Sequence, residues 1–399
     1  MPVKPVTVSA QWVRAAVVAA QHIPDPAGPG EYRDAAEVLR GIGLIQLDPL
    51  TRVSTAQRLT SLTRLPRKYR AESVDAALWP AEAPVSFESF TKVACVFPLQ
   101  DWPLLHLRRQ KFREKYAPTL GESIRAQIIE VVGSQPRGVQ IGTIETALGS
   151  ARTTGWNWSE IKQAAELMVR MGDLVITSRQ GVVRLFDLPE RALPQQLREA
   201  DQLPPDELRA GLARRAAGSL AVMTVADFAH HYHLSKTDAA HGIDLAGLVP
   251  VAVEGWRETA YCLPQLLEEN YDDVGLGEVR QARLIGPFDP LLRDRGRARR
   301  IFDFDYTFEA YVPRDKRLYG HYVMAVLSGA ELIGRTDLQR VGDVLQLNAV
   351  FPESGRPARS VTARTKAAAS TLARQLGTAV QLPGESGQSV RVNSSQTVS

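Results

Sequence analysis

The sequence predicts an α+β protein in which tandem winged-helix units, a form of helix-turn-helix, are followed by a C-terminal antiparallel β-rich domain. Three observations support this prediction. The chain has 399 residues, enough for two or three cores. A helical pattern followed by a hairpin pattern occurs twice, and the hairpins end at Pro189 and Pro264, 75 positions apart. The last third consists of short β-rich runs separated by turn residues.

Residues 1–118 are expected to form the first winged-helix-like unit. Ser9 can serve as the N-cap of the first helix, and Gly41 and Gly43 should end the second. The expected elements are helices over 9–21 and 32–41, an extended run over 44–49 and a helix over 53–63. This order resembles a helix-turn-helix unit with a strand inserted.

The second and third winged helices are expected over 119–195 and 196–275. In each, helical sequence leads into a β-hairpin that turns at a glycine. The landmarks are a helix over 157–171, turns at Gly181 and Gly255, and hairpin ends at Pro189 and Pro264.

The C-terminal part divides into a β-rich domain over 276–383 and a Ser- and Gln-rich tail over 384–399, which we expect to be disordered. Turn pairs such as Ser328-Gly329 favour antiparallel pairing. The β runs are expected over 302–312, 319–327, 331–338 and 344–351, followed by one helix over 363–376.

Composition excludes several classes of protein. Lys and Arg number 48 against 44 Asp and Glu, so the net charge of +4 does not by itself indicate a nucleic-acid partner. The apolar run over 15–20 is too short for a signal peptide or a membrane span, which predicts a cytoplasmic protein with no membrane partner. Cys95 and Cys262 lack metal or disulfide spacing, and we expect both to be buried apolar residues.

The sharpest local motif is Gln46-Leu47-Asp48. On an extended segment the side chains of Gln46 and Asp48 project from one face, where an amide can orient a water and a carboxylate can accept its proton. The alternative is structural: Asp48, preceding Pro49, caps the helix that follows. From spacing alone the structural interpretation is favoured.

Three further groups invite a binding role. Five arginines precede the β-rich region and either grip phosphates or form a solvated loop: Arg293, Arg295, Arg297, Arg299 and Arg300. Trp156 and Trp158 either stack on bases or pack the start of a helix. The histidines at 230, 231 and 233 lack a supporting carboxylate or cysteine, so a surface or hydrogen-bonding role is favoured, and no metal or cofactor is predicted.

Four motifs, taken in order, resemble those of the YcaQ/AlkZ family of winged-helix DNA glycosylases, which act on alkylated and crosslinked DNA. They are Ile45-Gln46-Leu47-Asp48, Gly155 to Ser159 with Lys162, Arg184 to Arg191, and Gly286 to Arg295. The resemblance runs from about residue 9 to residue 380. It implies three winged helices with a β-rich end, and it implies that Gln46 and Asp48 are the Gln-x-Asp catalytic pair associated with the YcaQ branch.

The resemblance also implies an activity: a monomeric, monofunctional DNA glycosylase that hydrolyses the N-glycosidic bond of N7-alkylated purines in double-stranded DNA, with unhooking of interstrand crosslinks left open. The expected DNA contacts are Arg293, Arg295, Arg297, Arg299, Arg300, Trp156 and Lys162. The alternatives are a non-catalytic winged-helix transcriptional regulator and a self-resistance glycosylase specific for one DNA-alkylating natural product. Two positions depart from the family pattern, since Lys92 and Gln57 stand where His is common.

Overall fold

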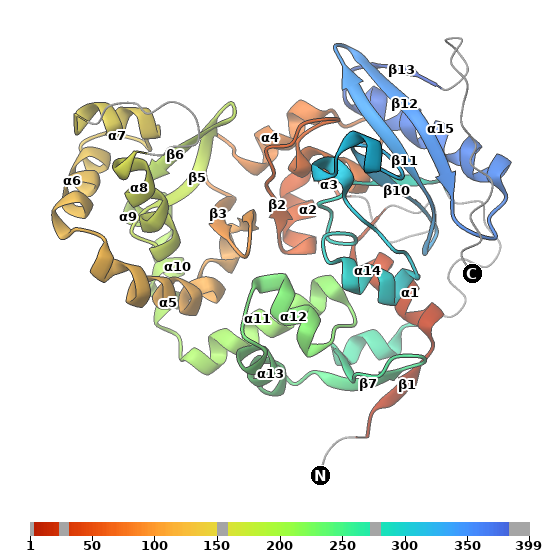
Figure 1. The fold of residues 1–399 in the computed structure, drawn as a ribbon. Helices are drawn as coiled ribbons and strands as arrows, with labels where there is room; N and C mark the ends of the chain where they lie inside the picture. The colour runs from red at the N-terminus through yellow and green to blue at the C-terminus, as the bar shows by residue number, and fades with distance from the viewer. Residues whose placement is uncertain (1–3, 24–31, 150–158, 272–280, 383–399) are drawn as a thin grey trace.

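A computed structural model describes residues 4–23, 32–149, 159–271 and 281–382. Trp156, Trp158 and the tail over 384–399 therefore lie outside the described residues. Figure 1 shows one lobe, with α6–α8 and the β5–β6 hairpin, joined through α5 to a larger body that holds the N-terminal helices, α11–α13 and the C-terminal sheet. No helix in the described ranges is long and apolar enough to cross a membrane.

The first unit is a set of helices followed by a hairpin that pairs with an earlier strand. Its three-stranded sheet has the order β2-β4-β3, and both pairings are antiparallel. The elements are α1 (Ala10–Ala20), α2 (Ala35–Ile42), β2 (Ile45–Gln46), α3 (Ala56–Arg64), α4 (Ala71–Leu78), β3 (Ser86–Phe90) and β4 (Ala94–Pro98). The strand β2 therefore lies between two helices in sequence but at the edge of the three-stranded sheet in space.

The helix boundaries follow from capping residues. Ser9 caps α1 as expected, since its Oγ accepts a hydrogen bond from the backbone N–H of Trp12 at 2.9 Å. The second helix begins three residues later than expected because Asp34 is its N-cap and accepts from the N–H of Glu37. Gly43 ends this helix with a φ of +85°, a conformation that favours glycine.

The second and third units repeat the order of the first. The second comprises α6 (Glu122–Gly133), α7 (Ile141–Ala147), α8 (Glu160–Met171), β5 (Val175–Gln180) and β6 (Val183–Asp187). The third comprises α11 (Pro205–Leu220), α12 (Val225–Tyr232), α13 (Lys236–Leu245), β7 (Val249–Val253) and β8 (Ala260–Cys262). In each, a single residue between the first two helices bridges the last strand, at Val139 with Phe186 and at Met223 with Tyr261. These bridges correspond to the β2–β4 pairing.

Short segments link the three units. A longer helix, α5 (His106–Tyr116), packs against α8 and α11. The short helices α9 (Pro189–Ala192) and α10 (Gln195–Glu199) lead from the second hairpin to the third unit. The N-terminal strand β1 (Val6–Val8) pairs in parallel with β7, so the start of the chain completes the sheet of the third unit.

The C-terminal domain contains a five-stranded sheet with the order β13-β12-β11-β10-β9. Four strands are antiparallel as expected, whereas β13 runs parallel to β12 at the edge. The strands are β9 (Arg283–Ile285), β10 (Val323–Ser328), β11 (Glu331–Val341), β12 (Val344–Pro352) and β13 (Ala379–Gln381). The helix α15 (Ala358–Gln375) covers this sheet and begins five residues before the expected start at 363.

The expected β run over 302–312 is wrong. Phe302 ends helix α14 (Arg295–Phe302), and the residues after it form irregular chain with one short turn of 3₁₀-helix. The misleading signal is the alternation of Phe304, Tyr306 and Phe308, which are all buried. These rings fill the core from a loop, so they show the period of a strand without pairing to one.

The first unit and the C-terminal sheet share one hydrophobic core, which also includes Val251 and Ala260 of the third unit, so the expected domain limit at 276 does not separate independent cores. A buried ion pair crosses the same boundary. Arg64 on α3 is fully buried, and its two terminal nitrogens lie 2.7 and 3.0 Å from the carboxylate oxygens of Asp289. The second unit keeps a separate core.

Candidate active site

Gln46 and Asp48 lie at the end of β2, beside the β3–β4 hairpin. Gln46 is 8% exposed and pairs with Cys95, and the N–H of Leu47 donates to the carbonyl of Ala94 at 2.8 Å. This extended backbone places the Gln46 and Asp48 side chains on the same side, and the Gln46 side chain is close enough to the Asp48 carboxylate to lower its pKa. The structure thus brings the two predicted residues together.

The environment of Asp48 makes its carboxylate more basic. Partial burial raises the pKa of Asp48, and the hydrogen bond from the Leu50 N–H, at 3.0 Å, and then the nearby Gln46 side chain oppose that rise. The bond to Leu50 closes a local turn around Pro49. Asp48 does not cap the next helix, because α3 begins only at Ala56. Its carboxylate therefore closes a local turn and has a pKa above that of an ordinary aspartate.

The C-terminal sheet closes one side of the Asp48 loop. The N–H of Arg340 on β11 donates to the carbonyl of Arg52 at 2.9 Å, and the Arg52 side chain bonds Gln339. Tyr322, just before β10, is fully buried, and its hydroxyl has no partner among the described residues. Burial and then the negative charge of Asp48 raise the pKa of Tyr322, so the Tyr322 phenol interacts electrostatically with the Asp48 carboxylate. Sequence reasoning missed Tyr322 because nothing local distinguishes it from a core tyrosine.

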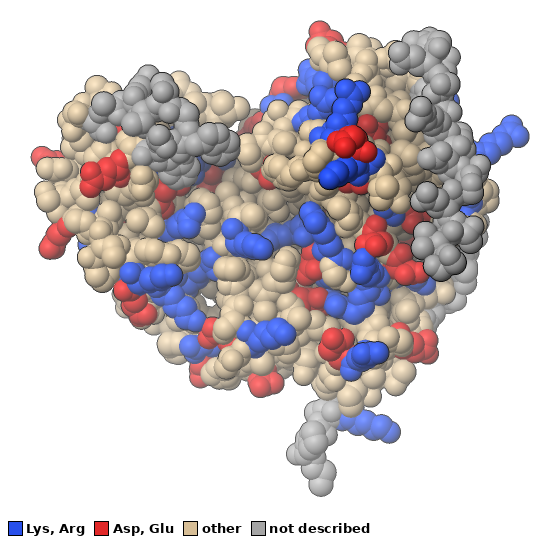
Figure 2. Space-filling view, in the orientation of Figure 1, with Lys and Arg blue, Asp and Glu red and all other residues tan. Residues whose placement is uncertain are grey.

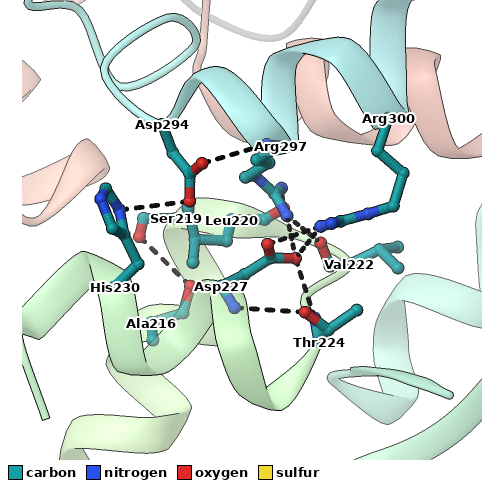
Figure 3. Close-up of polar contacts among 10 residues, drawn as sticks. All are labelled: Ala216, Ser219, Leu220, Val222, Thr224, Asp227, His230, Asp294, Arg297 and Arg300. Carbon is teal, nitrogen blue, oxygen red and sulfur yellow. Dashed lines mark hydrogen bonds and ion pairs between the residues drawn. The ribbon is translucent and has the colours of Figure 1, made fainter. Parts of the chain in front are cut away.

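The arginine run over 293–300 does not form one exposed surface. Figure 3 shows Arg297 and Arg300 reaching from α14 to Asp227 on α12. Arg297 is 5% exposed and donates to Asp227 at 2.9 Å and to the carbonyls of Val222 and Leu220 at 2.8 and 2.6 Å. Arg300 also donates to Asp227, at 2.5 and 2.6 Å.

Arg297 is therefore wrong as a DNA contact, because its guanidinium is buried and bonded within the protein. Burial raises the pKa of Asp227, but Arg297 and Arg300 outweigh that effect and hold it below its ordinary value. Arg300 is half-buried in the same cluster. The cluster joins the third unit to the C-terminal domain, which is a structural role.

The other predicted contacts have different settings. Arg295 and Arg299 are exposed, and Arg299 pairs with Asp305, whereas Arg293 is half-buried. Lys162 lies in the first turn of α8, where its backbone N–H donates to the N-cap Ser159 at 3.1 Å. These residues remain predicted DNA contacts.

His230 and the two cysteines have the roles that the sequence favoured, whereas His231 is buried and its Nε2 has no hydrogen-bond partner among the described residues. His230 lies 3.1 Å from the Asp294 carboxylate, and His231 is buried with its pKa held well below the ordinary value by burial and then by nearby cations such as Arg293. Cys95 and Cys262 are free and buried. No group of His, Cys, Asp and Glu that could hold a metal ion occurs among the residues described.

The two positions that depart from the family pattern lie in different places. Gln57 on α3 is buried, and its amide donates to Asp75 on α4 at 3.2 Å, next to the Arg58 ion pair with the same carboxylate. Lys92 is exposed at the tip of the β3–β4 hairpin. Gln57 therefore serves helix packing, while Lys92 faces solvent at the tip of the hairpin that pairs with β2.

Basic side chains gather on one face of the molecule. Figure 2 shows a band of Lys and Arg across the middle of this face, between the positions of α5 and α14 in Figure 1. Above the band, the outline is notched between the lobe of the second unit and the C-terminal sheet. This local concentration explains how a chain with a net charge of +4 can present a cationic surface.

Comparisons with known proteins agree with this arrangement. A solved structure with a similar fold is the Streptomyces sahachiroi DNA glycosylase AlkZ, with a TM-score of 0.63 at 16% identity, covering 94% of this chain and all of that one. The likeness shows the fold. The family model described as DNA glycosylase AlkZ-like matches residues 39–378. That match spans most of the 399 residues, and the chain belongs to the AlkZ-like DNA glycosylase family.

Proposed function

We propose that this DNA glycosylase hydrolyses the N-glycosidic bond of N7-alkylated purines in double-stranded DNA, with Gln46 and Asp48 as the catalytic pair. The observation that carries the proposal is the position of these two side chains, together at the end of β2 and with a carboxylate of raised pKa. A regulator that only reads an operator has no need of a basic carboxylate beside an amide.

The chemistry suits this pair. Alkylation at N7 makes the purine cationic and a good leaving group, so the enzyme need not protonate the base strongly. What remains is to stabilise an oxocarbenium-like sugar and to deliver water to its anomeric carbon, the same charge problem as in glycoside hydrolysis. Asp48 would accept the proton of that water and oppose the positive charge, while Gln46 would hold Asp48 and the water in place.

We expect a monofunctional enzyme, because hydrolysis by water needs no covalent adduct with a lysine. The product would be an abasic site in an intact strand. The test incubates the protein with a duplex containing 7-methylguanine and compares the strand before and after alkali. Cleavage before alkali, or trapping of a covalent adduct by borohydride, would contradict the monofunctional mechanism.

The range of lesions is the second part of the proposal. A crosslinked purine cannot be flipped fully into a tight pocket, because it stays joined to the opposite strand. The notched, cationic face is open, which suits attack on a base inside or near the stack by a monomer. A panel with a methylated lesion, a nitrogen-mustard crosslink and a bulky natural-product adduct separates a general repair enzyme from a dedicated resistance enzyme.

A further inference from the structure

Four basic side chains from four elements converge on the tip of the β3–β4 hairpin. We call Lys92, Arg108, Arg170 and Arg293 the hairpin-tip cluster. The guanidinium of Arg108, from α5, donates to the carbonyl of Thr91 at 2.5 Å, and Arg293 donates to the Thr91 hydroxyl at 3.5 Å. Arg170, from α8, lies over the ring of Phe90 with its guanidinium carbon 4.1 Å from the ring centre.

The cluster lacks an opposing carboxylate. Among the residues described, none of the four side chains forms an ion pair with Asp or Glu, and two buried nitrogens, Nε of Arg170 and Nη1 of Arg293, have no hydrogen-bond partner. Burial, and then the charge of Arg170, lowers the pKa of Arg108 to about 10. Holding cations close together without an anion raises the free energy of the folded protein. A bound anion would lower it, so the cluster suits an anionic ligand.

Three other interior arginines of this protein are each neutralised by a carboxylate. Arg64 meets Asp289, Arg215 meets Asp101, and Arg297 meets Asp227, each within 3 Å. In those places the ion pair completes the structure. The hairpin-tip cluster has the opposite arrangement, in which the positive charge is assembled and the negative charge is missing from the described chain.

The cluster adjoins the catalytic pair. The β2–β4 pairing sets Gln46 against Cys95, and the Leu47 N–H bond to Ala94 continues that register toward the tip. Lys92 stands three positions from Cys95, roughly 10 Å at the rise of a strand. An anion bound at the tip would therefore lie about three nucleotides or fewer from a sugar held at Asp48, given a spacing of about 3.4 Å per base along a strand.

We propose that the hairpin-tip cluster binds a backbone phosphate of the DNA within about three nucleotides of the nucleotide under attack. Lys92 is its direct ligand because its side chain is exposed, and the half-buried Arg293, whose Nη1 is buried without a hydrogen-bond partner, adds positive charge beside it. Arg108 and Arg170 hold the hairpin tip and add positive potential. Guanidinium and ammonium groups suit a phosphate, and the site orients the strand without reading its sequence. This proposal rests on the assignment as a DNA glycosylase.

The test measures how salt weakens DNA binding. Each lost phosphate contact lowers the slope of log affinity against log salt by about 0.9. We expect Lys92→Gln to lower the slope by about that amount, and Arg293→Gln to lower it by less, on an undamaged duplex and on one with an abasic-site analogue. The matched control is Arg33→Gln, an exposed arginine already paired with Glu37, which should keep the wild-type slope.

Lys92→Gln decides the proposal if Arg293→Gln does not fold, because Lys92 is exposed and supports no packing. A wild-type slope for folded Lys92→Gln would overturn the phosphate site. Binding needs no excision, so this result is separate from the test of the proposed function. A wild type that binds with the expected slope and excises nothing would contradict only the proposed chemistry.

Discussion

Replacing Asp227 should open the junction between the third unit and the C-terminal domain. Asp227 is 3% exposed, and its carboxylate accepts hydrogen bonds from Arg297, Arg300 and the backbone N–H of Thr224. In Asp227→Ala the buried Arg297 loses its counter-charge, which typically costs about 3–5 kcal/mol. The change also removes half of the capping box of α12, and loss of a cap costs about 1 kcal/mol. The expected loss is about 4–6 kcal/mol.

Hydrogen exchange measured by mass spectrometry resolves this effect locally. A loss of about 4 kcal/mol corresponds to roughly a thousandfold faster exchange, at tenfold per 1.4 kcal/mol, in peptides from α12 and α14. The control is Asp206→Ala, whose ion pair with Arg209 is exposed and should contribute about 1 kcal/mol or less. Equal, small effects of the two variants would refute the reasoning about the buried cluster.

Three further predictions follow from the titrating groups. The pKa of Asp227 is lowered in the folded protein, so its contribution to stability is present above the ordinary carboxyl pKa and is lost as pH falls through the folded value; acid unfolding of Asp227→Asn should lack this component. The raised pKa of Asp48 predicts that excision declines in acid with a midpoint above that of a free aspartate, which a pH–rate profile measures. Tyr322→Phe removes a buried hydroxyl without a described partner, so thermal unfolding should show equal or higher stability, and a loss above about 1 kcal/mol would contradict this.

Local patterns were enough to predict the parts of the fold that are built locally. The turns at Gly181 and Gly255 fall in the β5–β6 and β7–β8 hairpins, and Ser9 caps the first helix. The period-two spacing of Gln46 and Asp48 correctly placed the two side chains together. These features depend on neighbours within a few residues, which a sequence displays directly.

Features that depend on partners distant in the chain could not be predicted from the sequence. Arg297 stands in a basic run, yet its partner Asp227 lies 70 positions earlier, so its burial was not visible. Lys92 stood out only as a departure from a family pattern. The arginines that surround it come from α5, α8 and the segment before α14, and only the packing of three units brings them to one hairpin tip.

The central claim is that Asp48 is the general base of an alkylpurine DNA glycosylase. Its most direct test is single-turnover excision of 7-methylguanine from a duplex by the wild type and by Asp48→Asn, which keeps the shape of the side chain and removes its basicity. With Asp48 as the general base, we expect the wild type to release the base. Excision by Asp48→Asn should be slower by roughly 10²–10⁴-fold, with DNA binding retained. Excision by Asp48→Asn at the wild-type rate would contradict it.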